Sequence, residues 1–424
     1  MVSLRFVHAA DLHLDTPFEG LGQVAPAVAE LLRDASLNAW DRLVQLCIDQ
    51  HAEFLILAGD IYDGEQRGVR AQLRFLRGLE RLSAHRIDVF VAHGNHDPAA
   101  GRWSAIREWP PGVTVFGHEH VESVLVRRDD ATLAAIQGIS HATRAVSENL
   151  ALRFRRGPES CPHLAVLHCN ADRDPDHPLY SPCSLDDLRA AGMDYWALGH
   201  IHNYRMLSSG DCCAVYAGAL QGRSLKPSER GTKGAVIGTI DNGAVTGCRF
   251  VPVPHVRFVE FAVDVADIAD IGRLVARLDQ GVDAELASGA AAGLVARTRL
   301  TGRGPVYRDL QAANAVDELL ERMREEATGR APFVWWSALR NETRPDIDRN
   351  AIRSRGDFSA ELVRLVDALR EDEPRLTGFV EGKTGDLWTS SLERASGNLD
   401  ADLRSLVEEA EMLALGKLEP GSGE

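Results

Sequence analysis

Short apolar runs that lead directly into polar residues dominate the first part of this chain. Runs of this length, with glycine or proline nearby, are typical of strands in a covered sheet. Between them lie stretches with apolar residues at helical spacing, such as Leu43, Leu46 and Cys47, which predict helices. The pattern therefore predicts an α/β domain whose strands include residues 5–7, 54–58, 89–92, 164–167 and 195–198.

The pattern fades after residue 254, where Pro252 and Pro254 suggest a domain boundary. A second unit follows, in which two expected strands flank one helix. From about Pro332 the chain is polar, and its apolar residues mostly follow helical spacing. We therefore expect three parts, which are an α/β domain at residues 1–254, a small α+β capping domain at 255–331 and a helical region at 332–424.

The composition is that of a folded, soluble protein. Apolar residues make up 45% and charged residues 26% of the chain, and no apolar run approaches the roughly 18 residues that cross a bilayer. The N-terminus, with Arg5, His8 and Asp11 close together, does not resemble a signal peptide. The number of cysteines is odd and no C-x-x-C pair occurs, so neither a disulfide framework nor a thiolate zinc site is indicated. We expect a cytoplasmic protein with no membrane partner.

Five polar clusters follow the expected strands in order. Two divalent ions held about 3.5–4 Å apart need a bridging carboxylate with further oxygen or imidazole ligands around them. Side chains two positions apart in a loop at a strand end can converge on one ion, and glycines let the backbone turn sharply. The clusters are Asp11-Leu12-His13, Gly59-Asp60, Gly94-Asn95-His96-Asp97, His168 and Gly199-His200-Ile201-His202.

Each cluster alone has a plainer interpretation. A buried histidine is more often a structural group than a metal ligand, and a lone Asp-x-His or Gly-Asp is common. Gly-Asn-His-Asp is rarer, and five clusters in order, each just past an expected strand, favour one shared site. Because the donors mix carboxylate, imidazole and amide oxygen, they favour manganese, iron or zinc over calcium.

These motifs resemble those of the calcineurin-like metallophosphoesterases, whose pattern is D-x-H, G-D, G-N-H-[DE], H and G-H-x-H. The resemblance covers about residues 3–255. It implies a four-layer β-sandwich flanked by helices, with two divalent metal ions, for which we expect Mn²⁺, at one edge. Carried over by position, one ion would be held by Asp11, His13, Asp60 and His202, and the other by Asp60, Asn95, His168 and His200. Asp60 would bridge the two ions.

Further segments resemble the SbcD and YhaO group of DNA repair exonucleases. They are residues 8–15, 215–223 and, in the C-terminal region, 335–353. This resemblance implies a DNA exonuclease that works in DNA repair, and it implies a coiled-coil ATPase partner of the SbcC or YhaN type, which the C-terminal helices would engage. A homodimer is left open. One departure is Asp63, which stands where some repair nucleases carry a histidine that helps to place the scissile phosphate.

The expected mechanism is hydrolysis by a metal-activated water that attacks phosphorus in line. His96 is the candidate general acid for the leaving oxygen, although a role in binding the phosphate alone fits the sequence as well. Asp97 either orients His96 or caps the turn that follows it, because Pro98 comes next and Asp is a common turn residue.

A net charge of −15 argues against DNA binding by the whole surface, so DNA contact would need a local basic track. One candidate follows the last metal motif and consists of Arg223, Lys226, Arg230 and Lys233. Such side chains contact backbone phosphates without reading the sequence. The alternative interpretation of this segment is a solvated loop.

Three functions remain open from the sequence. The group resemblance favours a DNA exonuclease that acts at ends. A phosphatase or small-molecule phosphodiesterase on the same fold is the second, although Gly64 stands where protein phosphatases carry an arginine. The third is a non-catalytic subunit that tethers DNA ends to an ATPase, although a decayed enzyme is expected to lose ligands and every ligand position is filled here.

Overall fold

A computed structural model describes most of the chain. The described residues are 3–16, 26–64, 68–100, 104–129, 131–172, 178–208, 212–289, 291–384 and 399–418. The chain forms two compact units. The first comprises residues 1–260, 282–297 and 324–337, and the second comprises residues 261–281, 298–323 and 338–424.

Two six-stranded sheets form the centre of the first unit. One has the order β12-β11-β1-β2-β3-β4, in which β1 to β4 are parallel to one another, β11 is antiparallel to β1, and β12 is antiparallel to β11. Its strands are β1 (Leu4–Ala9), β2 (Phe54–Ala58), β3 (Asp88–Ala92), β4 (Val113–Val115), β11 (Gly234–Asp241) and β12 (Ala244–Pro252). The other has the order β5-β6-β7-β8-β10-β9, with parallel pairing from β6 to β10. Its strands are β5 (Glu122–Arg128), β6 (Ala131–Gly138), β7 (His163–His168), β8 (Tyr195–Gly199), β9 (Arg205–Ser208) and β10 (Cys213–Tyr216).

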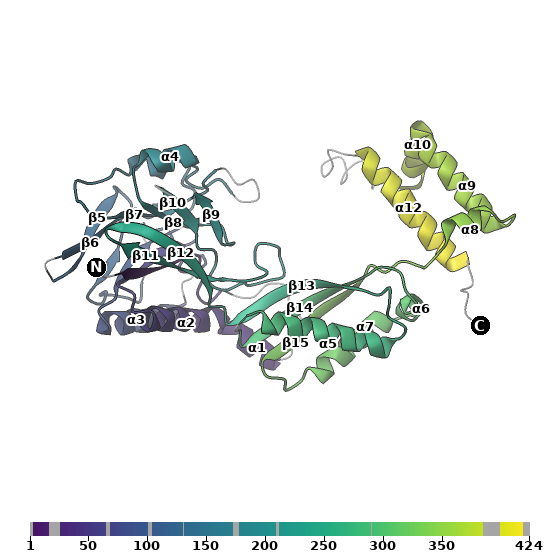
Figure 1. Ribbon diagram of the computed structural model, residues 1–424, viewed down its shortest axis with the longest axis horizontal. Coiled ribbons are helices and arrows are strands. Elements are labelled where there is room, and N and C mark those ends of the chain that lie inside the picture. Colours follow the sequence, from purple (N-terminus) through teal and green to yellow (C-terminus); the bar gives the residue numbers. More distant parts are fainter. Residues whose placement is uncertain are drawn as a thin grey trace. The chain divides into compact units, whose positions relative to one another are not determined.

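Helices cover the outer face of each sheet, which gives four layers (Figure 1). On the first sheet lie α2 (Ala35–Asp49) and α3 (Val69–Ala84), which bury Trp40 and Phe75 against it. On the second lie the short helices η1 (Leu150–Arg153) and α4 (Leu185–Ala190). The inner faces of the sheets meet in a core of alternate strand residues that includes Phe6, Phe54 and Tyr195. The four-layer sandwich predicted from the sequence is confirmed.

A third, smaller sheet has the order β13-β14-β15. Its strands are β13 (Val256–Asp264), β14 (Gly293–Thr301) and β15 (Phe333–Asn341), and the helices of this region are α5 (Ile271–Ala287), α6 (Tyr307–Gln311) and α7 (Ala315–Glu326). The segment expected to be helical from residue 332 therefore begins with a strand. Val334 and Trp336 are buried and Trp335 between them is half-buried, which is the two-residue alternation of a strand.

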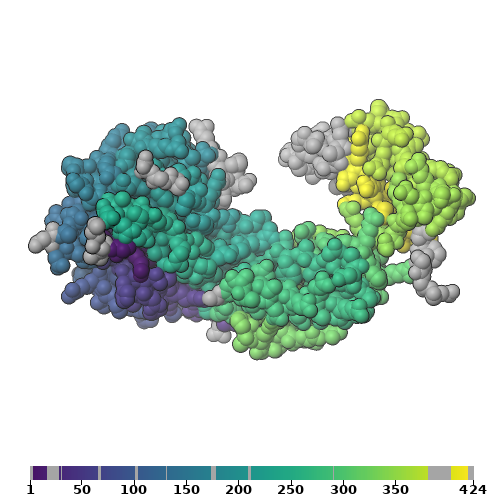
Figure 2. Space-filling view, viewed as in Figure 1, coloured from purple at the N-terminus to yellow at the C-terminus, as the bar shows by residue number. Residues whose placement is uncertain are grey.

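The C-terminal region is helical, as predicted. Its elements are α8 (Arg349–Arg353), α9 (Phe358–Glu371), α10 (Glu373–Thr384) and α12 (Leu399–Leu418). Val366 of α9 packs with Val380 of α10 and with Val407 of α12, so the three helices share a small apolar core. Figure 2 shows α12, in yellow, against these helices. None of the helices within the described residues is long and apolar enough to cross a membrane.

A helix that precedes α2 completes the fold. It is α1 (Pro26–Arg33), whose Leu32 packs with Val256, Phe258 and Val295. The same cluster takes in Leu225, from the segment that follows the last metal motif. The packing of Leu225 thus holds the segment around residues 223–233 against the first unit.

Candidate metal centre

The predicted metal-binding clusters meet at one edge of the sandwich, where strands of both sheets end. Asp11 and Asp60 follow β1 and β2, and His168 is the last residue of β7. The backbone N–H of Asp11 donates to the Gly59 carbonyl at 3.0 Å. His168 Nδ1 donates to the carbonyl of Ala58, on the other sheet, at 3.0 Å. This bond turns His168 Nε2 toward the cluster.

Gly199, at the end of β8, allows the two sheets to approach at this edge. A Cβ at this position would lie 1.8 Å from the Ala58 carbonyl oxygen and 2.8 Å from His168 Nδ1. Any residue other than glycine would push β8 away from β2. The glycine of the G-H-x-H motif is therefore required by the close packing that brings ligands from both sheets together.

One group of ligands consists of Asp11, His13 and His202. One donor atom from each lies within 4.8 Å of the other two. The Nε2 atoms of His13 and His202 are 3.3 Å apart. Two imidazole nitrogens at this distance, beside a carboxylate, can converge on a single cation. The structure thus brings together three of the four residues predicted for the first ion.

A second group consists of Asp11, Asp60 and His168, again with donors within 4.8 Å. His168 Nε2 lies 3.4 Å from Asp60 Oδ2 and 2.9 Å from Asn95 Oδ1. Asp60 Oδ2 is also 3.9 Å from His13 Nε2. One carboxylate therefore lies between the two histidines, as a bridging ligand must.

His200 lies beside the centre, next to His168, and bonds to other parts of the chain. Its backbone N–H donates to the Asp11 carboxylate at 3.1 Å, and its Nε2 donates to the Pro178 carbonyl at 2.9 Å. Its ring lies 5.3 Å from that of His168, centroid to centroid. Among the described residues, the carboxylate and histidine groups do not include His200. Its role as a ligand stays a prediction.

Several of these residues have unusual backbone conformations. The φ angles of Asp11, His13, Asp60 and His200 are 50°, 42°, 52° and 104°. Residues other than glycine rarely adopt positive φ, and each such residue costs on the order of 1–3 kcal/mol. Strain held by the surrounding structure at four neighbouring polar residues is typical of a functional site.

The buried carboxylates of this centre require positive charge. Burial raises the pKa of Asp11. Burial acts in the same direction on Asp60, but His168 outweighs it and holds the pKa of Asp60 well below its ordinary value. Burial lowers the pKa of His168, but the charge of Asp60 and their hydrogen bond raise it to about 9. A divalent ion would take over this compensation, so the donor set fits a metal centre.

His96, the predicted acid, lies next to this centre and is held by Asp63. Its ring centroid is 5.1 Å from that of His13, and its Nδ1 donates to Asp63 Oδ1 at 2.5 Å. The hydrogen bond to Asp63 raises the pKa of His96 above its ordinary value. An imidazole bonded to a carboxylate through Nδ1 keeps Nε2 for a substrate, which suits a proton donor.

Asp97 is buried and bonds to backbone groups of two loops. Its carboxylate accepts the backbone N–H groups of Gly94 at 2.8 Å and Ile61 at 2.9 Å. It also accepts from His93 Nδ1 at 3.0 Å. Asp97 thus fixes the loop that carries Asn95 and His96, and its predicted catalytic role stays a prediction.

The basic track predicted for DNA contact is largely occupied by internal partners. Lys233 is 2% exposed, and its ammonium donates to His202 O, Asn203 Oδ1 and Ser228 O, so its prediction as a phosphate contact is wrong. Arg230 pairs with Glu260 at 2.5 Å. Arg223 pairs with Asp63 and Glu229. Lys226 is exposed and stays a predicted DNA contact.

Glu229 is a residue whose importance the sequence did not reveal. It is buried, and its Oε1 accepts from His202 Nδ1 at 2.7 Å. Burial acts to raise its pKa, but His202 and Arg223 hold the pKa of Glu229 well below its ordinary value. A lone acid within a basic segment was the available signal. A carboxylate that holds the outer nitrogen of a metal-binding histidine is a common second layer of such sites.

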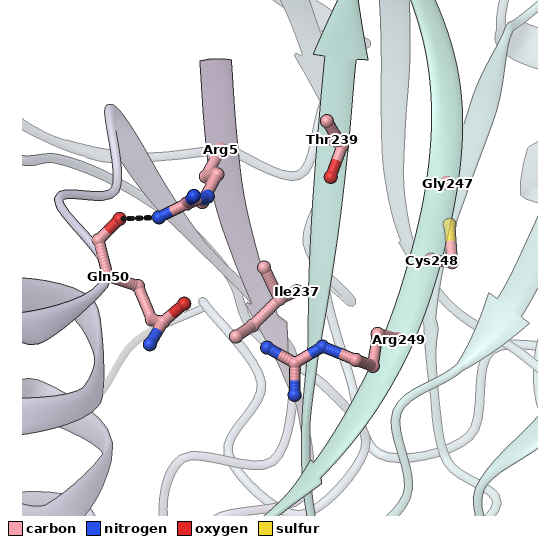
Figure 3. A pocket seen from close by; sticks show the side chains of 7 residues that line it. All are labelled: Arg5, Gln50, Ile237, Thr239, Gly247, Cys248 and Arg249. Carbon is pink, nitrogen blue, oxygen red and sulfur yellow. Dashed lines mark hydrogen bonds between the residues drawn. The ribbon is translucent and has the colours of Figure 1, made fainter. Parts of the chain in front are cut away.

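A cavity of about 410 Å³ lies elsewhere in the first unit, beside the beginning of β1 rather than its end (Figure 3). It is lined by Arg5, Gln50, Ile237, Thr239, Gly247, Cys248 and Arg249. None of these is among the predicted metal-binding or catalytic residues. The cavity is therefore separate from the metal centre.

Comparisons with known proteins agree with this geometry. The family model of the calcineurin-like phosphoesterases matches residues 4–204, and that of the YhaO middle domain matches residues 258–344. The uncharacterized metallophosphoesterase YhaO of Bacillus subtilis is 32% identical over 343 residues, which are 81% of this chain and 83% of that protein. The chain belongs to the calcineurin-like phosphoesterases. As a calcineurin-like phosphoesterase it is a hydrolase of phosphodiester bonds, and its family uses a dinuclear centre of divalent metal ions.

Two further relatives of this phosphoesterase are named DNA double-strand break repair protein Mre11. The one from Thermoplasma acidophilum is 28% identical over 221 residues, which are 49% of this chain and 57% of that protein. The one from Methanopyrus kandleri is 23% identical over 415 residues, which are 89% of this chain and 86% of that protein.

Proposed function

We propose that this phosphoesterase is a metal-dependent DNA exonuclease that acts at DNA ends in double-strand break repair. The observation that carries the proposal is the extent of its similarity to proteins named for that repair process, which reaches 89% of the chain in one case. Metal motifs alone would be shared by phosphoesterases with unrelated substrates, so they do not distinguish DNA from other esters.

The residues of the centre have distinct parts in the proposed reaction. When bound, two divalent ions supply a water of lowered pKa and neutralise charge on the phosphate. Asp60, which lies between His13 and His168, would contribute its carboxylate to both ions, and Asn95 and His168 would hold the second. His96 delivers its Nε2 proton to the oxygen that leaves, while Asp63 holds the imidazole in place through Nδ1.

We propose manganese as the metal. The donors are carboxylate oxygens, imidazole nitrogens and one amide oxygen, a mixture that suits manganese better than calcium, which prefers oxygen alone. No cysteine belongs to the ligand groups found among the described residues, so nothing in the donor set selects a thiolate-binding metal.

We further propose that a coiled-coil ATPase of the SbcC type binds the C-terminal helices. Phe358 and Leu365 are one heptad apart on α9, and their side chains are 73% and 47% exposed. Leu406 and Leu413 are related in the same way on α12, and both are exposed. Exposed apolar pairs at helical spacing support a helical partner. The cytoplasm is the proposed location, because all seven cysteines are free thiols.

One observation favours a second candidate, a phosphodiesterase for small esters. Three of the four side chains predicted to bind DNA are used within the protein: Arg223 and Arg230 are in ion pairs, and Lys233 is buried. A small substrate needs no basic track. The two candidates share one chemistry and differ in what they hold outside the metal centre.

The deciding experiment compares three substrates in the presence of Mn²⁺. They are end-labelled linear DNA, the same DNA as a closed circle and a small aryl phosphodiester. The proposal predicts nucleotide release from linear DNA and an intact circle. All turnover should be lost in Asp60→Ala and kept in Glu148→Ala, which removes an exposed carboxylate. Cleavage of the aryl ester alone would refute a DNA exonuclease for the isolated chain and favour the second candidate.

A further inference from the structure

A chain of hydrogen-bonded side chains connects a metal ligand with the proposed acid. It begins at His202, passes through Glu229, Arg223 and Asp63, and ends at His96. The successive contacts are His202 Nδ1 to Glu229 Oε1 at 2.7 Å, Arg223 Nη2 to Glu229 Oε1 at 3.1 Å, Arg223 Nη1 to Asp63 Oδ2 at 3.0 Å and His96 Nδ1 to Asp63 Oδ1 at 2.5 Å.

The inner members of this chain are well shielded from water. The side chains of Glu229 and Arg223 are only 7% and 16% exposed. The backbone N–H of Arg223 also donates to Glu229 Oε2 at 3.0 Å, so both carboxylate oxygens have partners. Charged hydrogen bonds in such surroundings are stronger than on an open surface, and they hold side chains in defined positions. Glu229 contacts His202 and Arg223 contacts Asp63, so each residue bears on the centre through another side chain.

We propose that Glu229 and Arg223 are positioning residues that set the metal ligand His202 and the acid His96 as one unit. Glu229 Oε1 accepts a hydrogen bond from the Nδ1–H of His202, and this tautomer leaves His202 Nε2 as the metal-binding nitrogen. Arg223 holds Asp63 against His96, with its other amino group anchored on Glu229. The proposal rests on the metal centre and the acid role of His96 assigned under the proposed function.

The shared oxygen of Glu229 makes the two residues separable by experiment. Loss of Arg223 leaves the bond between His202 and Glu229 in place but releases Asp63. Loss of Glu229 removes the partner of His202 and the anchor of Arg223 together. Arg223→Ala should therefore impair proton donation without weakening metal binding, and Glu229→Ala should impair both.

Metal binding is the first readout, and it needs no turnover. Titration of the metal-free protein with Mn²⁺ in a calorimeter should show one of two sites weakened by about 10- to 100-fold in Glu229→Ala. Glu229→Gln keeps an oxygen that can accept from His202 Nδ1, so it should restore most of the affinity. Arg223→Ala and the surface control Glu148→Ala should bind as the wild type does. Equal affinity in Glu229→Ala and wild type would overturn the role of Glu229.

The second readout is dependence on the leaving group, which a merely structural role would not change. A p-nitrophenyl diester of thymidine phosphate needs little protonation of its leaving oxygen, whereas the dinucleotide TpT needs much. Arg223→Ala should lose at least about 10-fold more kcat on TpT than on the nitrophenyl ester, within the range that general acids contribute. Equal losses on both substrates would overturn the role of Arg223.

Two measures keep these outcomes distinct from misfolding and from failure of the proposed function. The first is the melting temperature of every variant. The second is Arg223→Lys, whose ammonium can reach only one of the two carboxylates, so its kcat on TpT should lie between those of the wild type and Arg223→Ala. Wild-type protein that cleaves TpT but not DNA ends would sink the exonuclease proposal and leave the positioning test intact. A wild type that binds manganese at one site only would overturn both.

Discussion

Removal of the metal ions should lower the thermal stability of the first unit by a large amount. Without metal, two buried carboxylates, from Asp11 and Asp60, rely on histidines for compensating charge. The Nε2 atoms of His13 and His202, 3.3 Å apart, then face each other without a shared cation. Metal binding relieves both conditions, and the unfolded chain offers no such site, so the binding free energy adds to the free energy of unfolding.

The size of this effect follows from mass action. An ion present at 100 times its dissociation constant contributes about 2.7 kcal/mol, so two ions contribute about 5 kcal/mol. The first unit has nearly 300 residues, and an unfolding entropy of about 2.1 cal/mol/K per residue means that each kcal/mol shifts its Tm by about 1.6 °C. The expected difference between the melting temperatures of the manganese-loaded and the metal-free protein is therefore about 8 °C.

Differential scanning calorimetry in excess Mn²⁺ and in excess chelator measures this difference. Asp60→Asn removes the carboxylate placed between the two ligand groups, so it should abolish most of the shift. Glu148→Ala, a surface carboxylate variant, should keep all of it. Equal melting temperatures with and without metal, or an undiminished shift in Asp60→Asn, would refute the reasoning.

Three further predictions concern other residues. His96→Ala should lower kcat in steady-state assays by about 10²- to 10⁴-fold. Its Mn²⁺ affinity, measured by calorimetric titration, should stay unchanged. A variant with full turnover would exclude His96 as the acid. Gly199→Ala should strongly destabilise the first unit, because its Cβ would lie 1.8 Å from the Ala58 carbonyl oxygen, whereas Gly356→Ala, with open space around it, should melt like the wild type. His8→Leu should reduce the decrease in the free energy of unfolding at acid pH, because burial lowers the pKa of His8 to about 3. As pH falls below 6.5, the unfolded chain binds a proton that the folded chain does not. Between pH 7 and pH 5, the free energy of unfolding of the wild type, measured in urea, should therefore fall by roughly 2 kcal/mol more than that of the variant. Equal decreases in both proteins would contradict the assignment.

The fold of the first unit was predictable because its strands carry their own signal. The buried residues of β2 begin and end where the apolar run 54–58 begins and ends, and the polar ligands follow at once. Residues at parallel strand ends converge whatever the loops between them do. That is why the meeting of Asp11, Asp60 and His168 could be expected from one sequence.

The partners of these residues were harder to predict. Asp97 is next to His96 in sequence, yet it is turned to the N–H groups of Gly94 and Ile61, while Asp63 from a different loop binds the imidazole. Such pairings depend on how loops fold against one another, which hydrophobic periodicity does not encode.

Burial of charged groups was likewise invisible in the sequence. Lysine is almost always exposed, so Lys233 was expected on the surface, but three oxygen acceptors satisfy its ammonium inside the protein. The strand β15 was missed for another reason. Its two tryptophans follow one another, so the alternation of buried and half-buried residues does not show as alternation of apolar and polar ones.

The most direct test of the dinuclear centre is a crystal structure of the protein loaded with Mn²⁺, with the ions located by their anomalous scattering. The account predicts two peaks about 3.5–4 Å apart, one on each side of the Asp60 carboxylate, with His13 and His202 on one ion and Asn95 and His168 on the other. A single peak, or two peaks that Asp60 does not bridge, would contradict it.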